Sequence, residues 1–299
     1  MAATLVDFSN ELANTVERAG GAVIAVPEGG RVGVSGTIWR EGIAITASHT
    51  IHGQDEVKVV LPSGSEVKAT VAGRDSGTDI AVLKLPEAVQ GKALAEAAVI
   101  RTGEIVLTVG RRKEGVAAAH GLIGAVGGPW RTYTGARVDR WVSLDLTPFP
   151  GFSGGPVVNV RGEVLGMATS GVRRSAVVIT AATVNRVVDQ LLKDGRTLRG
   201  YIGVAMQPVA FPEGSWQSLG IRGNRGLLVT AVAEDSAAAE ARIMLGDVIV
   251  GIEGELIRSA RDLQWALDGE SVGKSIALEV VRGGQVVKIA VKVREKPDR

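Results

Sequence analysis

The chain contains no cysteine. It therefore has no disulfide framework, no thiol nucleophile and no cysteine-based zinc or iron–sulfur site. Histidine is scarce as well, with 3 residues in 299, and none of them belongs to a His-Glu-x-x-His motif, which argues against a zinc hydrolase. We expect the protein to need no metal ion and no other cofactor.

Neither a strong charge nor a long apolar run is present. The net charge is +2, from 34 Lys and Arg against 32 Asp and Glu, which is too balanced to indicate nucleic acid or an anionic membrane as a partner. No apolar run reaches the ~18 residues of a membrane span. Residues 1–14 carry two acidic side chains and lack the basic start of a secretory signal. We expect a cytoplasmic protein if the sequence is complete, and a periplasmic one if a signal was removed.

Glycine is abundant, with 40 residues, about twice the usual share. Residues 3–19 show the apolar spacing of an amphipathic helix. From there to residue 183, short β-rich runs alternate with Gly, Pro, Asp or Ser, a pattern typical of an all-β barrel or sandwich. Residues 184–193 return to helical spacing. Beyond them, strands at 201–205, 226–232, 246–252, 276–282 and 285–293 and helices at 236–242 and 259–269 indicate a second, α+β domain.

A serine between glycines carries the strongest chemical signal, in the segment 151–156, GFSGGP. It matches the Gly-x-Ser-x-Gly nucleophile elbow of α/β-hydrolases, but in that fold the catalytic histidine follows the serine. No histidine follows Ser153, so a histidine base must come from upstream. The candidates are His49, His52 and His120.

Chain order narrows the choice. His49 lies at the end of an apolar run, and Asp79 directly precedes the apolar run 80–85. A short acid at such a position can hold an imidazole in one tautomer. The order His49, Asp79, Ser153 is one of the three known orders of a catalytic triad. The order Asp79, His120, Ser153 would need a parallel α/β sheet, which the run of short strands does not support.

Three strings, ITASHTI, GTDIAVLKL and PGFSGGPVVN, resemble the His, Asp and Ser motifs of trypsin-like serine proteases. More narrowly, they resemble the HtrA-type family, which joins a chymotrypsin-like double barrel to a C-terminal PDZ domain. The strings RGYIGV (199–204) and SAAAEARIMLGDVIVGIEGELI (236–257) resemble that PDZ domain. The resemblance implies an all-β double β-barrel protease domain at 1–195, with its N-terminal helix at 3–19, followed by an α+β PDZ domain at 197–299.

The resemblance also implies roles for individual residues. Ser153 is the expected nucleophile, His49 the general base and Asp79 the group that orients it. The backbone N–H groups of Gly151 and Ser153 are expected to form the oxyanion hole. The resemblance places neutral residues in the specificity pocket, so we do not expect cleavage after Lys or Arg: Thr147, Thr169, Ser170 and Gly171.

The implied function is endoproteolysis of unfolded or exposed polypeptides, in protein quality control. Four residues of the second domain are expected to bind peptide C-termini: Tyr201, Ile202, Gly203 and Val204. The family resemblance also suggests a homo-oligomer, a trimer joined by the N-terminal segment. Phe152 stands where the family has Asn or Asp, so the alternative is a catalytically weak protease-like chaperone, or a peptide-binding sensor or scaffold.

Overall fold

A computed structural model describes residues 4–28, 31–51, 53–87, 89, 91–112, 115–132, 135–146, 150–170 and 177–296. The chain divides into two compact units, Met1–Thr197 and Leu198–Arg299. Within the described ranges, no helix is long and apolar enough to cross a membrane.

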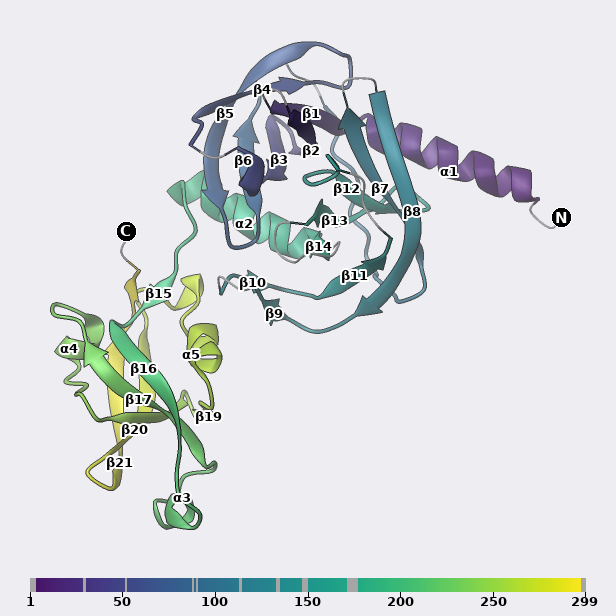
Figure 1. The fold of residues 1–299 in the computed structure, drawn as a ribbon. Helices are drawn as coiled ribbons and strands as arrows, with labels where there is room; N and C mark the ends of the chain where they lie inside the picture. The colour runs from purple at the N-terminus through teal and green to yellow at the C-terminus, as the bar shows by residue number, and fades with distance from the viewer. Residues whose placement is uncertain are drawn as a thin grey trace. The chain divides into compact units, whose positions relative to one another are not determined.

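The N-terminal unit consists of two closed antiparallel barrels of six strands each, with order β1-β2-β3-β6-β5-β4 and β11-β14-β13-β12-β7-β8 (Figure 1). The expected all-β double barrel is therefore confirmed. The first barrel contains β1 (Val23–Glu28), β2 (Arg31–Arg40), β3 (Ile43–Ala47), β4 (Glu56–Val60), β5 (Glu66–Asp75) and β6 (Ile80–Lys84). The second contains β7 (Ile105–Arg112), β8 (Gly115–Val126), β11 (Val142–Asp145), β12 (Pro156–Asn159), β13 (Val164–Thr169) and β14 (Val177–Thr180).

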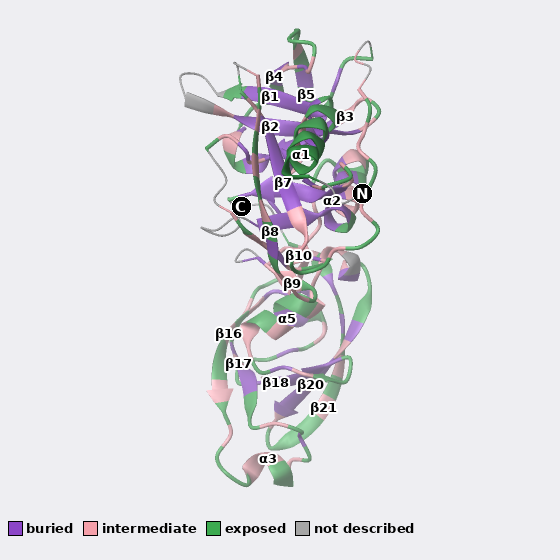
Figure 2. Ribbon diagram, turned by 90° about the vertical axis from the view of Figure 1, so that its right-hand side faces the viewer, coloured by how far each residue is buried: buried purple, intermediate pink, exposed green. Residues whose placement is uncertain are grey.

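Two helices flank these barrels. α1 (Leu5–Gly20) begins at a capping box in which Thr4 and Asp7 satisfy each other's backbone N–H groups. α2 (Ala181–Asp194) is longer than the helix expected at 184–193, and it ends at Gly195, whose positive φ of 70° suits glycine. The apolar face of α2 is buried in the core of the unit through Val184, Val187, Val188 and Leu191. Buried strands fill both barrels, whereas much of α1 is exposed (Figure 2).

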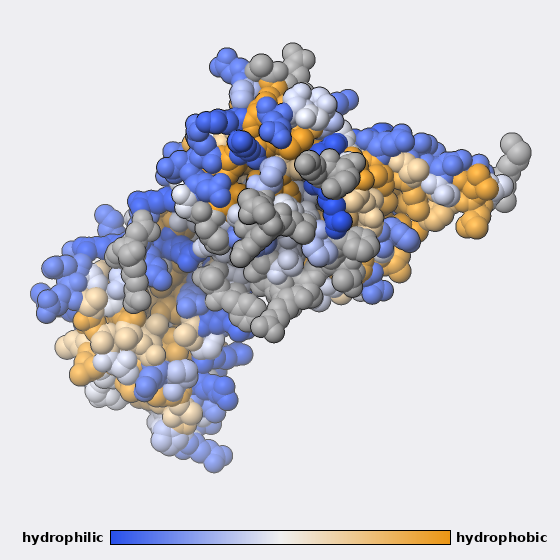
Figure 3. Space-filling model, turned by 45° about the horizontal axis from the view of Figure 1, so that its top comes forward, coloured by the Kyte–Doolittle hydropathy of each residue, from blue (hydrophilic) through white to orange (hydrophobic). Residues whose placement is uncertain are grey.

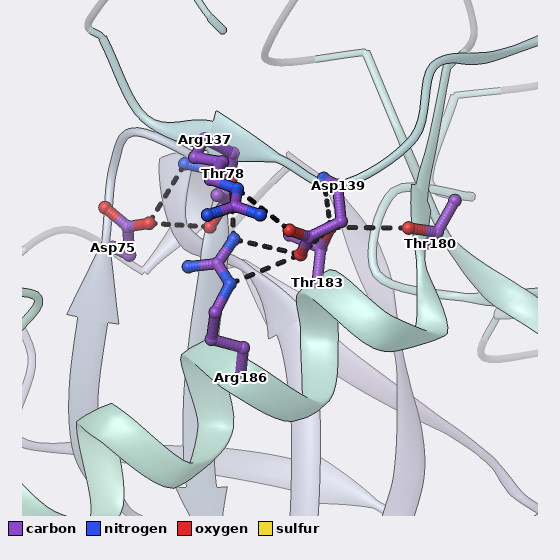
Figure 4. Close-up of polar contacts among 7 residues, drawn as sticks. All are labelled: Asp75, Thr78, Arg137, Asp139, Thr180, Thr183 and Arg186. Atoms are coloured by element: carbon purple, nitrogen blue, oxygen red, sulfur yellow. Dashed lines mark hydrogen bonds and ion pairs between the residues drawn. The ribbon is translucent and has the colours of Figure 1, made fainter. Parts of the chain in front are cut away.

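A small hairpin, β9 (Trp130–Arg131) with β10 (Arg137–Val138), lies between β8 and β11. The residue after it, Asp139, ties this segment to α2 (Figure 4). Its carboxylate accepts a hydrogen bond from the Thr183 hydroxyl at 3.0 Å and forms ion pairs with Arg137 and Arg186, both at 3.1 Å. The sequence pattern did not predict this hairpin, because each of its strands has only two residues.

The C-terminal unit is built on a sheet with the strand order β16-β17-β18-β20-β21. A PDZ-like α+β arrangement was expected here and is confirmed. Its strands are β15 (Gly200–Tyr201), β16 (Val204–Ala210), β17 (Arg225–Val232), β18 (Val248–Ile252), β19 (Glu255–Leu256), β20 (Ser275–Arg282), β21 (Gln285–Lys292) and β22 (Arg294–Glu295). Its helices are α3 (Ser215–Ser218), α4 (Ala237–Glu240) and α5 (Ala260–Ala266), followed by the 3-10 turn Gly269–Ser271.

The expected helix at 259–269 is thus α5 and a separate turn. Asp262 accepts the Ser259 N–H at 2.9 Å and completes the capping box at the start of α5.

A buried ion pair stabilises this second unit. Asp247, whose exposed fraction is 2%, accepts two hydrogen bonds from Arg282 at 2.8 and 2.7 Å and one from the Met244 N–H at 2.8 Å. Burial raises the pKa of Asp247, but the hydrogen bonds from Arg282 and Met244 and the charge of Arg282 outweigh it. The pKa of Asp247 therefore lies below its ordinary value.

This depressed pKa predicts an acid-labile second unit. The pair's contribution is fully present above the unfolded-state pKa of ~3.9 and is lost as the pH falls through the lower folded-state pKa. We expect Asp247→Asn to lower the free energy of unfolding of this unit at pH 7 by about 3 kcal/mol. Hydrogen exchange of β18, followed by mass spectrometry, measures this locally. Glu279→Gln, at an ion pair with the exposed Lys288, is the matched control and should change exchange little.

Candidate active site

The turn that carries Ser153 directly precedes β12 and is held by β2 of the other barrel. The Ser35 N–H donates to the Ser153 carbonyl at 3.1 Å. Gly154 has φ of 88°, and a Cβ there would lie 2.1 Å from the Ser35 carbonyl oxygen, so this position requires glycine. The Thr37 hydroxyl donates to the Gly154 carbonyl at 3.0 Å. The nucleophile turn is therefore fixed by contacts between the two barrels.

Ser35 also orients Gly151. Its buried hydroxyl donates to the Gly151 carbonyl at 2.7 Å and accepts from the Arg111 N–H at 2.9 Å. The bond to the carbonyl constrains the peptide plane that follows Gly151. In the described part of the chain, no hydrogen bond occupies the N–H groups of Gly151 and Ser153. These two donors are available to an incoming ligand, as an oxyanion hole requires.

Phe152 lies between these two residues, and its side chain points into the protein interior. Its exposed fraction is 1%, and its ring lies against Gly110 so closely that a Cβ on Gly110 would approach within 2.6 Å of it. Apolar packing therefore anchors the loop at the position where the resembled family has Asn or Asp. Gly110 provides the space that this ring occupies.

His49 and Asp79 are brought together by the pairing of β3 with β6. His49 lies in the 3-10 turn Ser48–Thr50 directly after β3, and Ala47 of β3 is opposite Ile80 of β6. The His49 Nδ1 atom is 2.7 Å from Oδ2 of Asp79, and the His49 N–H donates to Oδ1 at 2.8 Å. Asp79 has φ of 62°, a conformation that costs a non-glycine residue free energy and is often found at functional sites.

Thr169 provides a further contact to this carboxylate. It lies at the end of β13, is 2% exposed, and its hydroxyl donates to Oδ2 of Asp79 at 2.5 Å. The sequence led us to expect Thr169 in the wall of the specificity pocket, and this contact was not foreseen. The available signal was a hydroxyl residue at the end of the buried apolar run VLGMA, where it must find a polar partner.

The other expected residues are placed as follows. Ser170 is close to the nucleophile, since its Oγ lies 3.4 Å from Oγ of Ser153. Thr147, Gly171 and His52 lie outside the described residues. His120 is exposed on β8, opposite Leu107 of β7.

Asp75 closes the turn that precedes Asp79. Its buried carboxylate accepts a 2.7 Å hydrogen bond from the Thr78 hydroxyl (Figure 4) and a 3.0 Å hydrogen bond from the Gly77 N–H.

The loop expected to bind peptides in the second unit precedes β16. Gly203 has φ of 86° and packs so tightly on Ser236 that no side chain would fit. The Ile202 and Gly203 carbonyls accept hydrogen bonds, both of 2.8 Å, from the Ala238 and Ala233 N–H groups. Tyr201 lies in β15, opposite Arg294, and Val204 begins β16.

Comparisons with known proteins cover most of the chain. Residues 34–167 match the trypsin-like peptidase domain family, and residues 200–293 match the PDZ domain family. A probable periplasmic serine endoprotease, DegP-like, of Brucella suis is 33% identical over 272 residues, which are 87% of this chain and 52% of the relative. A protein of the same description from Pseudomonas savastanoi is 33% identical over 270 residues, 86% of this chain and 54% of the relative. The chain spans about half the length of these curated relatives.

Solved structures of two proteases match this chain over almost its whole length. The HtrA-type protease AlgW with a decapeptide has a TM-score of 0.77 at 27% identity and covers 96% of this chain and 99% of its own. A serine endoprotease from Yersinia pestis has a TM-score of 0.75 at 25% identity, with 99% of this chain and 100% of the other covered.

Proposed function

The chain belongs to the HtrA/DegP-like trypsin-like serine proteases with a C-terminal PDZ domain, and we propose that it is itself a serine endopeptidase with the triad Ser153, His49 and Asp79. The observation that carries the proposal is the 2.7 Å contact between His49 Nδ1 and Asp79. A carboxylate at this distance holds the proton on Nδ1, which leaves Nε2 as the proton acceptor that a serine nucleophile needs.

The reaction uses groups that the structure describes. Oγ of Ser153 attacks the scissile carbonyl while His49 takes its proton, and His49 then gives that proton to the leaving amine. The N–H groups of Gly151 and Ser153 donate to the oxyanion of the tetrahedral intermediate. Water then repeats the sequence on the acyl-enzyme, and the product acid leaves with Ser153 regenerated.

Labelling with a fluorophosphonate probe tests this proposal, because the probe reacts with a serine oxygen only when a base activates it. The wild-type chain should label on Ser153 and should digest unfolded casein. Absence of both reactions in a folded protein would favour the alternative, a protease-like chaperone or peptide-binding scaffold.

We propose that the residue before the scissile bond is small or aliphatic. Ser170, whose Oγ lies 3.4 Å from Oγ of Ser153, is neutral, and Thr147 and Gly171 are uncharged residue types. An uncompensated Lys or Arg side chain buried in such a pocket would cost several kcal/mol. Mass spectrometry of the casein digest reads the cleavage sites directly, and a majority of cuts after Lys or Arg would contradict the proposal.

The second unit is proposed to bind the C-terminal ends of polypeptides at residues 201–204. Its PDZ family match supports this, as do the related AlgW structures, which hold a tripeptide or a decapeptide. Backbone N–H groups around a glycine turn suit a terminal carboxylate. Equal binding of a peptide acid and its C-terminal amide would argue against a carboxylate site.

Assembly and location are further proposals. Apolar side chains gather along one side of α1 (Figure 3). The helix carries three exposed large apolar residues, Leu5, Val6 and Phe8. This surface supports a homo-oligomer, a trimer by family resemblance, which light scattering of the purified chain would measure. The names of the curated relatives place them in the periplasm. They favour that compartment for this chain, which cell fractionation would test. A role in protein quality control is proposed from the family resemblance alone, and the degradation of unfolded proteins would test it.

We expect Thr169 to position Asp79 rather than to contact the substrate. Thr169→Val keeps the shape but removes the donor, so it should lower kcat about tenfold with little change in KM. Thr169→Ser retains a hydroxyl and should restore most of the rate. An equal loss in both variants, or a rise in KM alone, would show that Thr169 acts on the pocket instead.

A further inference from the structure

One edge of the PDZ sheet is open. β16 lies at the end of the strand order and pairs with β17, and in the described residues no strand lies along its other edge. α5 faces this strand (Figure 1). A peptide that occupies the site proposed above would therefore add to the sheet along the open edge of β16.

The direction of each backbone group along β16 follows from its two ends. Before the strand, the Gly203 carbonyl accepts the Ala233 N–H, and after it, the Phe211 N–H donates to the Asn224 carbonyl. Both bonds join β16 to the segment that continues β17. The bulge in this pairing adds its extra residue, Thr230, to β17, so alternation along β16 is unbroken. The backbone N–H and C=O groups of the odd-numbered residues therefore point toward β17. Those of the even-numbered residues point toward the open edge.

The residues whose backbone groups point toward the open edge are thus Val204, Met206, Pro208 and Ala210. Val204 and Met206 are half-buried against the apolar core of the unit. Pro208 is exposed, and it has no N–H to donate. The third pairing position of the open edge therefore offers an acceptor but no donor, and the pyrrolidine ring lies where the N–H would be.

We infer that Pro208 limits peptide recognition to the last four residues of the ligand. The inference rests on the proposed peptide site, which binds the C-terminal end of a polypeptide at residues 201–204. In an antiparallel pair, the last peptide residue lies opposite Val204, and the residue two positions earlier exchanges two hydrogen bonds with Met206. The residue four positions before the end meets Pro208, and its carbonyl finds no donor. Complete backbone pairing between the peptide and β16 is therefore limited to the last four residues of the peptide.

The consequence is a site that depends on a chain end and not on a long extended segment. The proline also protects the rest of the edge from pairing with other strands, as prolines on edge strands do. A polypeptide could present any free C-terminus of about four extended residues, whatever main-chain conformation precedes it.

Peptide length tests this inference. Unlabelled peptides of two, four, six and eight residues, of Ala and Ser with a C-terminal Val, compete with one labelled eight-residue peptide for the full chain carrying Ser153→Ala, so that no peptide is cleaved. Affinity should rise from two to four residues and change less than twofold from four to eight. With Pro208→Ala added, the eight-residue peptide should bind about fivefold tighter than the four-residue peptide, because one backbone hydrogen bond is restored.

Pro212→Ala, at an exposed proline beyond the strand, is the matched control and should leave the length dependence unchanged. Affinity that keeps rising beyond four residues in the protein with Pro208 overturns the inference and leaves the proposed peptide site intact. The same is true if a folded Pro208→Ala protein gains nothing from longer peptides. Failure of every acid peptide to bind overturns the peptide site and the inference together. If Pro208→Ala does not fold, the series of peptide lengths measured on the protein that retains Pro208 still tests the inference.

Discussion

Replacement of Ser153 by Ala is expected to lower kcat for casein cleavage by about 10⁶-fold. The three triad residues act as a unit, so removal of the nucleophile leaves only the contribution of the oxyanion donors and substrate binding. A loss of activity can be assigned to the missing hydroxyl, because the Ser153 side chain does not hold the turn. The Ser35 N–H and the Thr37 hydroxyl hold it by donating to the backbone carbonyls of Ser153 and Gly154. The folded state should therefore be unaffected.

The measurements are kcat and labelling by the fluorophosphonate probe, with circular dichroism as a check of folding. Ser63→Ala, at an exposed turn of the first barrel, is the matched control and should retain full activity and labelling. A folded Ser153→Ala protein that still cleaves casein at the wild-type rate would refute Ser153 as the nucleophile.

The sequence was informative where the relevant signal is local. Three signals each depend on a few neighbouring residues only. They are a strand followed by a histidine, an acid before an apolar strand, and a serine among glycines. Chain order then selected His49 over His120 as the expected base. In the structure, Nδ1 of His49 contacts the carboxylate of Asp79. Short apolar runs separated by turn residues are also a local pattern, and they predicted an all-β barrel or sandwich. The double barrel followed from the family resemblance of the motifs.

Contacts between distant strands were not predictable in this way. Ser35 reaches Gly151 and Thr169 reaches Asp79 only because the barrels close and pack together. Phe152 looked like a departure that could weaken the oxyanion loop. The structure shows that Gly110, on a neighbouring strand, accommodates its ring. No pattern along the chain relates these two residues, because their complementarity exists only after the second barrel has formed.

Replacement of Asp79 by Asn is expected to lower kcat by roughly 10⁴-fold. Oδ1 of Asp79 accepts the His49 N–H at 2.8 Å, so the amide oxygen of Asn should take that position. The amide nitrogen then takes the place of Oδ2 and donates to Nδ1 of His49. This moves the imidazole proton to Nε2, where it prevents His49 from accepting the proton of Ser153. The Thr169 hydroxyl can rotate to accept from the amide, so the fold should persist.

The loss should therefore lie in kcat, with KM nearly unchanged, and labelling by the fluorophosphonate probe should slow in parallel. Asp189→Asn, at an exposed ion pair with Arg40, is the matched control and should leave kcat unchanged. Asp79→Asn activity within tenfold of the wild type would show that the carboxylate does not set the tautomer of His49. Because the His49–Asp79 contact carries the proposed mechanism, that result would remove the main support for the proposed role of Asp79.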